Sequence, residues 1–198
     1  MTVFLVDDDE DIRLSLSRAL GKRGYVVEPH DSAQSFLDAY DDSRPGCLLL
    51  DYGMPGMNGL DLQRRLNDEG RAIPVIFITG HGGVPESVQA IKGGAIDFLE
   101  KPFRQSDLIE RIETAFAIAR ERLSSQVQSR QHEALFARLT AREAEIVARM
   151  LQRPAETSSK EIAAYLGISP RTVDHHRARI LEKLNVRSVA ELIALAKS

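Results

Sequence analysis

Short apolar runs alternate with longer amphipathic stretches over the first hundred residues, and this alternation limits the folds open to the chain. The runs occupy residues 2–6, 25–27, 47–50, 75–78 and 95–99. As a group the runs are rich in β-branched residues, and nearly unbroken hydrophobicity over so short a length is typical of strands covered on both faces. Amphipathic stretches that end near glycine, proline or a polar turn separate them, at residues 11–23, 33–40, 60–69 and 84–92. The pattern predicts an α/β, doubly wound, five-stranded parallel sheet.

A fifth helical stretch begins near Ser106 and keeps an apolar stripe as far as Leu123 and Val127, long past the last strand. Residues 123–135 contain neither proline nor glycine, so we expect a semi-rigid helical linker there. Beyond it the strand signals vanish and helix start signals replace them: Thr140 with Glu143, Ser158 with Glu161, Ser169 before Pro170, and Ser188 with Glu191. The remaining residues, 136–198, are predicted to form a small all-α domain of four helices.

Composition narrows the class of protein. Of the 198 residues 43% are hydrophobic. The sequence contains no run of ~18 apolar residues, the length that a membrane-spanning helix needs, so we expect a cytoplasmic protein without a membrane partner. One cysteine, Cys47, can form neither an internal disulfide nor a thiolate zinc cluster. Residues 1–139 carry 16 Lys and Arg against 22 Asp and Glu, whereas residues 140–198 carry 10 against 7. The net negative charge of residues 1–139 favours binding of a metal ion, and the net positive charge of residues 140–198 favours binding of the phosphodiester backbone of a nucleic acid.

Polar residues stand at the carboxyl ends of four of the predicted strands: Asp7, Asp8 and Asp9, then Asp51, Thr79 and Lys101. In a sheet of order 2-1-3-4-5 these strand ends meet at one edge, so the side chains are expected to line one pocket. Clustered carboxylates repel one another unless a hard cation intervenes, and Mg²⁺ (or Mn²⁺) takes one or two carboxylates with waters and a phosphoryl oxygen. Asp51 is the candidate nucleophile, because carboxylates form acyl phosphates. Capping of the next helix is the alternative role for these acids, and we assign it to Asp9.

The motifs Val6-Asp7-Asp8, Asp51-Tyr52-Gly53-Met54-Pro55, Thr79-Gly80 and Lys101-Pro102 resemble those of the receiver domain of bacterial response regulators, over residues 1–122. The resemblance implies a flavodoxin-like fold in which Asp51 accepts a phosphoryl group from a sensor histidine kinase. It implies that Asp7, Asp8, Asp51 and the carbonyl of Gly53 hold the metal, and that Thr79 and Lys101 bind phosphoryl oxygens. A cis bond between Lys101 and Pro102 is expected.

Phe98 resembles the aromatic switch of receivers, which would turn inward as Thr79 moves toward the phosphoryl group; core packing is the alternative. Gly53 departs from the family pattern, since many relatives carry a larger side chain two residues after the acceptor, and this leaves the lifetime of the phosphorylated state open. His81, two residues after Thr79, either influences that lifetime or is a solvated loop residue.

In the tail, Gly167 closes one predicted helix and Ser169-Pro170 opens the next, which is the spacing of a helix-turn-helix. With Lys160-Glu161-Ile162-Ala163 and Thr172-Val173, the tail resembles the DNA-binding domain of the FixJ/LuxR (NarL) type over residues 136–198. On the second helix of this motif, Val173, His176, Ile180 and Leu184 form an inward stripe.

The opposite face of that helix is expected to meet base edges through Arg171, Asp174, His175 and Ala178. Phosphate contacts are expected from Ser169, Thr172, Arg177, Arg179 and Lys183. A basic helix that merely keeps the domain soluble is the alternative. The loop of residues 153–159 is about three residues longer than the family pattern, with no expected role.

The two halves together predict a transcriptional regulator in which phosphorylation of Asp51 promotes homodimerisation and so DNA binding at a two-part, pseudo-palindromic site. The expected partners are a sensor histidine kinase, double-stranded DNA, a second copy of the chain and, as a further candidate, RNA polymerase. Besides phosphoryl transfer to itself and autodephosphorylation, no enzyme activity is expected. Two rival hypotheses are an aspartyl-phosphate hydrolase, for which Gly53 stands where the general acid would be, and a phosphorylation-independent DNA-binding or scaffold protein.

Overall fold

The computed structural model of the chain describes residues 1–80 and 84–196, with the side chains of residues 84–86 left out. The chain divides into two compact units, Met1–Ser124 and Ser125–Ser198. Each unit has its own buried core and is described by itself below.

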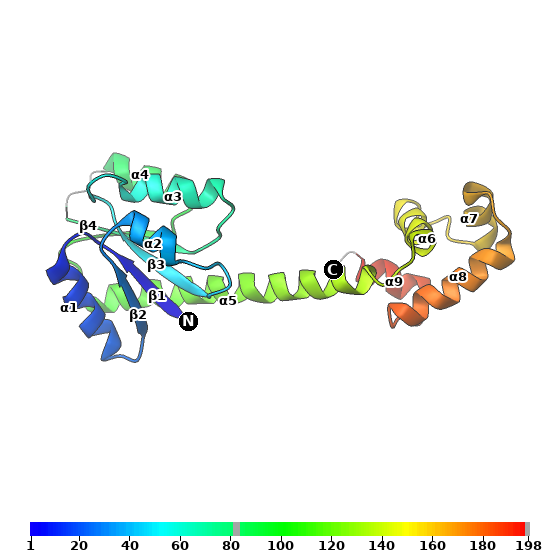
Figure 1. Cartoon of the computed structure of the whole chain (residues 1–198), viewed down its shortest axis with the longest axis horizontal. Coiled ribbons are helices and arrows are strands. Elements are labelled where there is room, and N and C mark those ends of the chain that lie inside the picture. Colours follow the sequence, from blue (N-terminus) through cyan, green and yellow to red (C-terminus); the bar gives the residue numbers. More distant parts are fainter. Residues whose placement is uncertain (81–83, 197–198) are drawn as a thin grey trace. The chain divides into compact units, whose positions relative to one another are not determined.

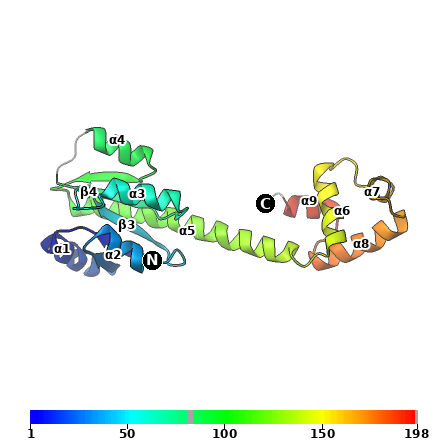
Figure 2. The ribbon, with the colours of Figure 1, turned by 45° about the horizontal axis from the view of Figure 1, so that its top comes forward.

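A parallel sheet forms the centre of the first unit (Figures 1 and 2), and its strands within the described residues are β1 (Thr2–Val6), β2 (Val26–His30), β3 (Gly46–Asp51), β4 (Val75–Thr79) and β5 (Asp97–Glu100). Their order is β2-β1-β3-β4-β5, which confirms the predicted topology. β2 runs three residues further than expected and includes Pro29, which an edge strand tolerates because one side of it has no ladder partner. β5 starts later than expected, since the Ala95 amide still bonds to the Ala90 carbonyl of the preceding helix.

Helices cover both faces of the sheet, with the bounds α1 (Glu10–Gly21), α2 (Ala33–Ala39), α3 (Gly59–Asp68), α4 (Val84–Lys92) and α5 (Gln105–Phe136). Alternate side chains of each strand point to opposite faces. Val3 and Leu5 pack with Leu20 of α1 and Leu108 of α5. Phe4 and its same-face neighbours pack instead with residues of α2, α3 and α4. The unbroken apolar runs of the sequence are therefore strands buried on both sides.

The expected apolar stripe of α5 packs only over its first half. Ile112, Phe116 and Ala119 are buried, whereas Leu123 and Val127 are 40% and 45% exposed. Residues 120–131 are all exposed, in agreement with the polar composition of this stretch. The apolar spacing predicts the helix correctly, but its side chains are buried only where α5 packs on the sheet.

The loop between Asp51 and α3 folds tightly against the sheet. Asn58 caps α3 by accepting a hydrogen bond from the Asp61 amide. A Cβ atom on Gly59 would lie 2.5 Å from the Asp51 carbonyl oxygen and 2.8 Å from the Phe77 ring. Glycine is therefore required here for α3 to begin directly beside the end of β3.

The second unit has a helical core formed by the end of α5 with α6 (Ala141–Gln152), α7 (Ser159–Leu166), α8 (Pro170–Lys183) and α9 (Val189–Leu195) (Figure 1). Thr140 and Ser158 form capping boxes with Glu143 and Glu161, as their spacing predicts. Gly167 ends α7 in the left-handed conformation, with φ of 66°, and α8 starts three residues later. These short-range signals fix the helix-turn-helix of α7 and α8.

Over the described ranges, 1–80 and 84–196, no helix combines the length and the apolar character needed to cross a membrane.

Candidate functional site

The sequence-predicted acceptor residues converge at the carboxyl edge of the sheet. Asp7 follows β1, Asp51 ends β3 and Thr79 ends β4; their exposed fractions are 2%, 8% and 2%. Lys101 follows β5, and its amide donates a 2.7 Å hydrogen bond to the Thr79 carbonyl. Three strands and one loop thus bring these residues to one place, because parallel strands end at the same edge.

The Lys101 ammonium lies between two carboxylates. Its Nζ is 2.9 Å from Asp7 Oδ2 and 3.0 Å from Asp51 Oδ1. Burial lowers the pKa of Lys101, but hydrogen bonds to the two carboxylates outweigh burial and raise it above its ordinary value. The lysine is therefore held in its charged form, as a phosphoryl-binding group must be.

Backbone amides hold the other carboxylate oxygens. The Asp9 amide donates to Asp7 Oδ1 at 2.9 Å, and the Gly53 amide donates to Asp51 Oδ2 at 2.7 Å. Sequence reasoning missed Arg13, whose Nη1 donates to the Asp7 carbonyl at 2.7 Å. Its place on the first turns of the helix after the acid tract was the one signal available. The two buried carboxylates are thus fixed in orientation by neighbours on three elements.

Two of the three expected metal-binding carboxylates, those of Asp7 and Asp51, meet at Lys101. Asp8 is exposed, and no group of three His, Cys, Asp or Glu side chains within the described residues is arranged to hold a metal ion. Both Asp7 and Asp8 follow β1, and only the Asp7 side chain is buried. Asp9 caps α1 by accepting from the amides of Asp11 and Ile12, as expected.

The donor set still fits a magnesium ion. Mg²⁺ is bound by one or two carboxylates with waters completing its shell, and Asp7 and Asp51 present two carboxylates around one positive charge. The Lys101 ammonium is a stand-in for such a charge, because it already bridges both groups. Asp7, Asp51, an inward-turned Asp8 and the Gly53 carbonyl are the residues that would hold the metal.

The expected switch residues, Thr79 and Phe98, lie on β4 and β5. Phe98 is half-buried on β5, and its ring centroid is 6.3 Å from that of Phe77. The Lys101–Pro102 bond is cis, which confirms that expectation. His81 lies outside the described residues. Thr79 and Phe98 are on neighbouring strands, where Thr79 pairs in register with Glu100.

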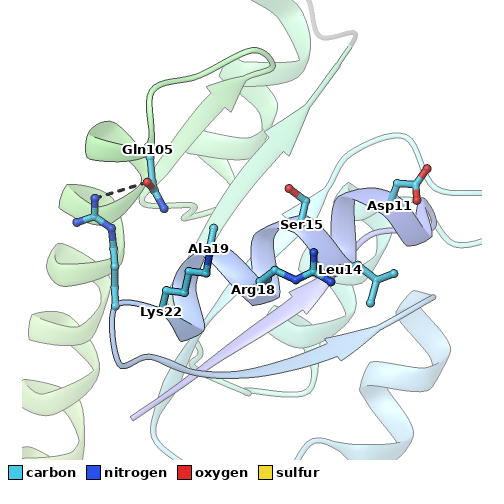
Figure 3. Close-up of a pocket in the computed structure, with 8 residues that line it drawn as sticks. Asp11, Leu14, Ser15, Arg18, Ala19, Lys22 and Gln105 are labelled. Atoms are coloured by element: carbon cyan, nitrogen blue, oxygen red, sulfur yellow. Dashed lines mark hydrogen bonds between the residues drawn. The ribbon is translucent and has the colours of Figure 1, made fainter.

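A groove lies on the outer side of α1 and is lined by Asp11, Leu14, Ser15, Arg18, Ala19, Lys22, Arg23 and Gln105 (Figure 3). Leu14 is 54% exposed, which is unusual for a leucine in mid-helix. The groove contains none of the acceptor residues. Because α1 starts at Glu10, however, its amino-terminal end adjoins the acceptor edge.

The second predicted surface is α8. Arg171, Asp174, His175 and Ala178 are exposed, while Val173, Ile180 and Leu184 are buried and His176 is half-buried, as the periodicity predicts. Of the expected phosphate contacts, Ser169, Thr172 and Arg179 are exposed. Ser169 caps α8 by accepting from the Thr172 amide.

Three α8 residues expected at DNA also form contacts within the domain. Lys183 forms a 2.6 Å ion pair with Glu143, which is 1% exposed. Arg177 donates to the Thr157 carbonyl at 2.9 Å and to Ser159 Oγ at 3.2 Å. Asp174 accepts a hydrogen bond from the Ser159 hydroxyl. Helical periodicity identifies the exposed face but does not reveal these partners on α6 and before α7.

Two family models match this chain: "Response regulator receiver domain" over residues 3–113 and "Bacterial regulatory proteins, luxR family" over residues 137–196. The chain belongs to the response regulator family. It is 41% identical over 192 residues to the transcriptional regulatory protein TdiR of Thauera aromatica, covering 97% of this chain and 83% of that protein. It is 40% identical over 195 residues to the transcriptional regulatory protein FixJ of Rhizobium meliloti, covering 98% and 94%. A solved structure of the response regulator StyR is similar over 99% of this chain and 98% of that chain, with a TM-score of 0.86 and 42% identity.

This response regulator is a phosphorylation-regulated, DNA-binding transcriptional regulator of a two-component system. Its family confirms the predicted receiver fold and LuxR-type domain. Membership implies a histidine kinase and DNA as partners and Mg²⁺ as the ion that receivers generally use. Both models describe regulatory proteins, which favours the regulator over the hydrolase hypothesis.

Proposed function

We propose that Asp51 is the phosphoacceptor of this regulator. Its carboxylate attacks the phosphorus of a kinase phosphohistidine; the P–N bond breaks, the imidazole leaves with a proton, and an acyl phosphate forms on Asp51. The observation that carries the proposal is the Lys101 ammonium, 3.0 Å from Asp51 Oδ1, which is in place to pair with a phosphoryl oxygen. Lys101 and the Gly53 amide orient the carboxylate, and Asp7, Asp8, Asp51 and the Gly53 carbonyl are proposed to hold Mg²⁺, or Mn²⁺ in its place. The bound ion supplies charge neutralisation at the transferring group.

The test is incubation with acetyl phosphate and Mg²⁺, read by intact mass. We expect a single phosphoryl adduct on the wild-type protein and none on Asp51→Asn. Asp68→Asn, which changes an exposed carboxylate at the last residue of α3, is the matched control and is expected to keep the adduct. An adduct of equal yield on Asp51→Asn contradicts the proposal. Equal promoter occupancy by wild type and Asp51→Asn, with and without phosphodonor, favours the phosphorylation-independent alternative.

Autodephosphorylation is proposed to follow from Gly53. A Cβ atom at this position would lie 3.6 Å from Asp51 Oδ2, so a larger side chain there would stand directly beside the acyl phosphate. Glycine leaves that side accessible to water, which hydrolyses the acyl phosphate to carboxylate and inorganic phosphate. We expect Gly53→Leu to lengthen the lifetime of the adduct, measured by mass after the phosphodonor is removed. A lifetime equal to the wild type's contradicts this role.

The kinase is proposed to dock on the α1 groove. A phosphohistidine must reach Asp51 from the acceptor edge, and α1 starts at that edge. Leu14 offers exposed apolar area between polar and basic neighbours in this groove (Figure 3). Leu14→Asp is expected to slow transfer from a phosphorylated sensor kinase while leaving transfer from acetyl phosphate unchanged. Equal slowing with both donors contradicts a docking role.

Phosphorylated receivers are proposed to pair through α4, as a homodimer that places two α8 helices on a pseudo-palindromic site. Val88 and Ile91 of α4 are 43% and 47% exposed, and α4 packs beside β5, which carries Phe98. Sedimentation with acetyl phosphate and Mg²⁺ is expected to show a dimer for wild type and a monomer for Val88→Glu. Val26→Glu, at a residue 63% exposed on the opposite sheet edge, is the control and dimerises. The complex is proposed to act in the cytoplasm, with RNA polymerase as a further partner.

A further inference from the structure

Two charged residues of α8 that the sequence assigns to DNA also bind within the domain. Asp174 and Arg177 are three residues apart, so they lie on one side of the helix. Asp174 binds Ser159, the first residue of α7, and Arg177 binds both Ser159 and the Thr157 carbonyl that precedes the helix. We call these four residues the α7 latch.

The Ser159 hydroxyl is the centre of the latch. It accepts a hydrogen bond from Arg177 Nη1 at 3.2 Å and donates its own proton to Asp174 Oδ1. The same Nη1 donates to the Thr157 carbonyl at 2.9 Å, immediately before the capping residue Ser158. Both charged groups of α8 therefore satisfy partners at the start of α7, and Ser159 and Arg177 are only partly exposed.

A separate contact holds the other end of α8. The 2.6 Å ion pair between Lys183 and Glu143 joins its last turn to α6. α8 is thus tied to α6 at its end and to the start of α7 at its middle. In a helix-turn-helix the first helix crosses the DNA backbone while the second enters the major groove, so their relative orientation decides whether both can bind together.

The loop of residues 153–159 ends in the latch and is itself anchored. Arg149 forms a 2.7 Å ion pair with Glu156 and lies over the Tyr165 ring of α7, 4.3 Å from its centroid. The extra length of this loop is therefore held at Glu156, at Thr157 and at Ser159. Lys160, the next residue of α7, is exposed beside this anchored loop end.

We propose that Asp174 and Arg177 are positioning residues for duplex DNA, acting on the start of α7 through Ser159 and Thr157, and contact neither base nor phosphate. Base reading then falls to Arg171, His175 and Ala178, and backbone contacts fall to Ser169, Thr172, Arg179 and Lys160. This inference rests on the proposed DNA-binding face of α8. It reassigns two residues of that face and gives a role to Ser159.

The probe is a duplex selected from a random-sequence library by the phosphorylated full-length protein. Binding of this duplex is measured over a range of salt concentrations, since each phosphate contact contributes about one unit to the slope of log K against log salt. Arg177→Ala is expected to weaken binding about ten- to hundredfold with the wild-type slope, because a charged hydrogen bond is lost within the protein. Arg179→Ala, the matched control at an exposed arginine two residues away, is expected to lower the slope by about one unit. Arg177→Lys can still donate to Thr157 and is expected to recover part of the affinity.

A double-mutant cycle tests Asp174. Asp174→Ala and Ser159→Ala are expected to weaken binding by similar factors, and the double variant by little more than either, because both remove the same hydrogen bond. Re-selection by each variant is expected to enrich the wild-type sequence. Ser159→Ala removes a single oxygen atom from a partly exposed residue and keeps the test usable if Arg177→Ala fails to fold, as judged by circular dichroism.

Two results would overturn the inference: a slope reduced by about one unit in Arg177→Ala, or an altered base preference in Asp174→Ala that Ser159→Ala does not share. The first would make Arg177 a phosphate contact, and the second would make Asp174 a base contact. Failure of the wild-type protein to enrich any sequence is a different result, which overturns the DNA-binding face itself and with it the latch.

Discussion

The acceptor edge and α8 both present charged residues, but they differ in how those charges are held. At the acceptor edge, Asp7, Asp51 and Lys101 come from different elements, are largely buried and contact one another. On α8 the charged residues share one element, and some are open to solvent while others pair with α6 or with the start of α7. The acceptor edge is therefore a buried chemical site, whereas α8 is an exposed surface whose helix is held by contacts with α6 and the start of α7.

The difference shows what a position in sequence can reveal. The carboxyl ends of parallel strands lie at one edge of the sheet, so the topology alone brings polar residues at those ends together. A helix position is placed only around the helix axis, and its partner depends on packing with other helices. Substitutions at the acceptor edge therefore test the mutual neutralisation of Asp7, Asp51 and Lys101. Substitutions on α8 test either a contact that holds the helix in the domain or a contact with DNA.

The largest effect on stability is expected at the acceptor edge, for Lys101→Met. Without the ammonium, two buried carboxylates face each other, and we expect the receiver to lose about 3 to 4 kcal/mol of unfolding free energy. Saturating Mg²⁺ is expected to restore part of this, by about 2.7 kcal/mol at a hundredfold excess over its Kd. Urea unfolding with and without Mg²⁺ measures both effects. Lys92→Met, at an exposed lysine of α4, is the control, and an equal loss there contradicts the proposed neutralisation.

In the DNA-binding unit the matching experiment is Glu143→Gln. Burial raises the pKa of Glu143, but the Lys183 ammonium and the Thr140 backbone and hydroxyl outweigh burial and lower it to about 2. Removing the charge is expected to cost about 2 to 3 kcal/mol of unfolding free energy, measured by urea unfolding. Glu145→Gln, at an exposed position two residues away on α6, is expected to change little. A cost at Glu145 equal to that at Glu143 would show that helix propensity, not the ion pair, is responsible.

The same residue predicts a pH dependence. Because the pKa is lower in the folded state than the ordinary value of 4.5, the stabilisation is complete above about pH 4.5 and disappears as the pH falls toward 2. We expect on the order of 3 kcal/mol to be lost across this window. Unfolding free energies measured between pH 6 and pH 2.5, in roughly half-unit steps, follow the effect. Glu143→Gln is expected to flatten the curve, and an unchanged curve in this variant assigns the acid sensitivity to other carboxylates.

Arg171→Ala tests a residue on the exposed face of α8 that is expected to contact DNA. Arg171 is exposed and makes none of the contacts that tie Asp174, Arg177 and Lys183 to the protein. We expect unchanged thermal stability and a loss of about 1 to 3 kcal/mol in binding to a selected duplex, with relaxed preference at one base pair. Arg187→Ala, an exposed arginine after α8, serves as the control. A loss of stability without a change in base preference would place Arg171 among the supporting residues.

The smallest effect is expected for Asp9→Ala. Asp9 caps α1 through the amides of Asp11 and Ile12, and losing a cap costs about 1 kcal/mol. The yield of phosphoryl adduct from acetyl phosphate should be unchanged, whereas Asp7→Ala should lower it. A fall in yield for Asp9→Ala equal to that for Asp7→Ala would give the cap a part in the chemistry.

Most of the fold follows from local patterns in the sequence. Apolar runs predicted the strands, and polar residues at their ends predicted the convergence of Asp51, Thr79 and Lys101. Ser-x-x-Glu and Thr-x-x-Glu spacing predicted the caps of α6 and α7. These predictions succeed because each depends on a residue's own strand or turn.

Other features depend on contacts between distant residues and could not be predicted. Nothing in the acid tract separates the buried Asp7 from the exposed Asp8, because the burial of Asp7 involves contact with Lys101, which is 94 residues away in the sequence. Likewise Glu143 reads as a capping residue, and its ion pair with Lys183 spans forty positions. The expected phosphate contact of Lys183 was drawn from helix periodicity, which carries no information about α6.

Gly59 has no reactive side chain, yet the choice of residue at this position is as restricted as at the proposed phosphoacceptor Asp51. Its missing side chain lets α3 begin against the Asp51 carbonyl and the Phe77 ring, where even a methyl group would collide with both. A saturation library of this gene should therefore reject nearly every replacement at codon 59, while tolerating many at the exposed codons of α3. Intolerance in such a library marks the places where backbones touch as well as the places where bonds are made.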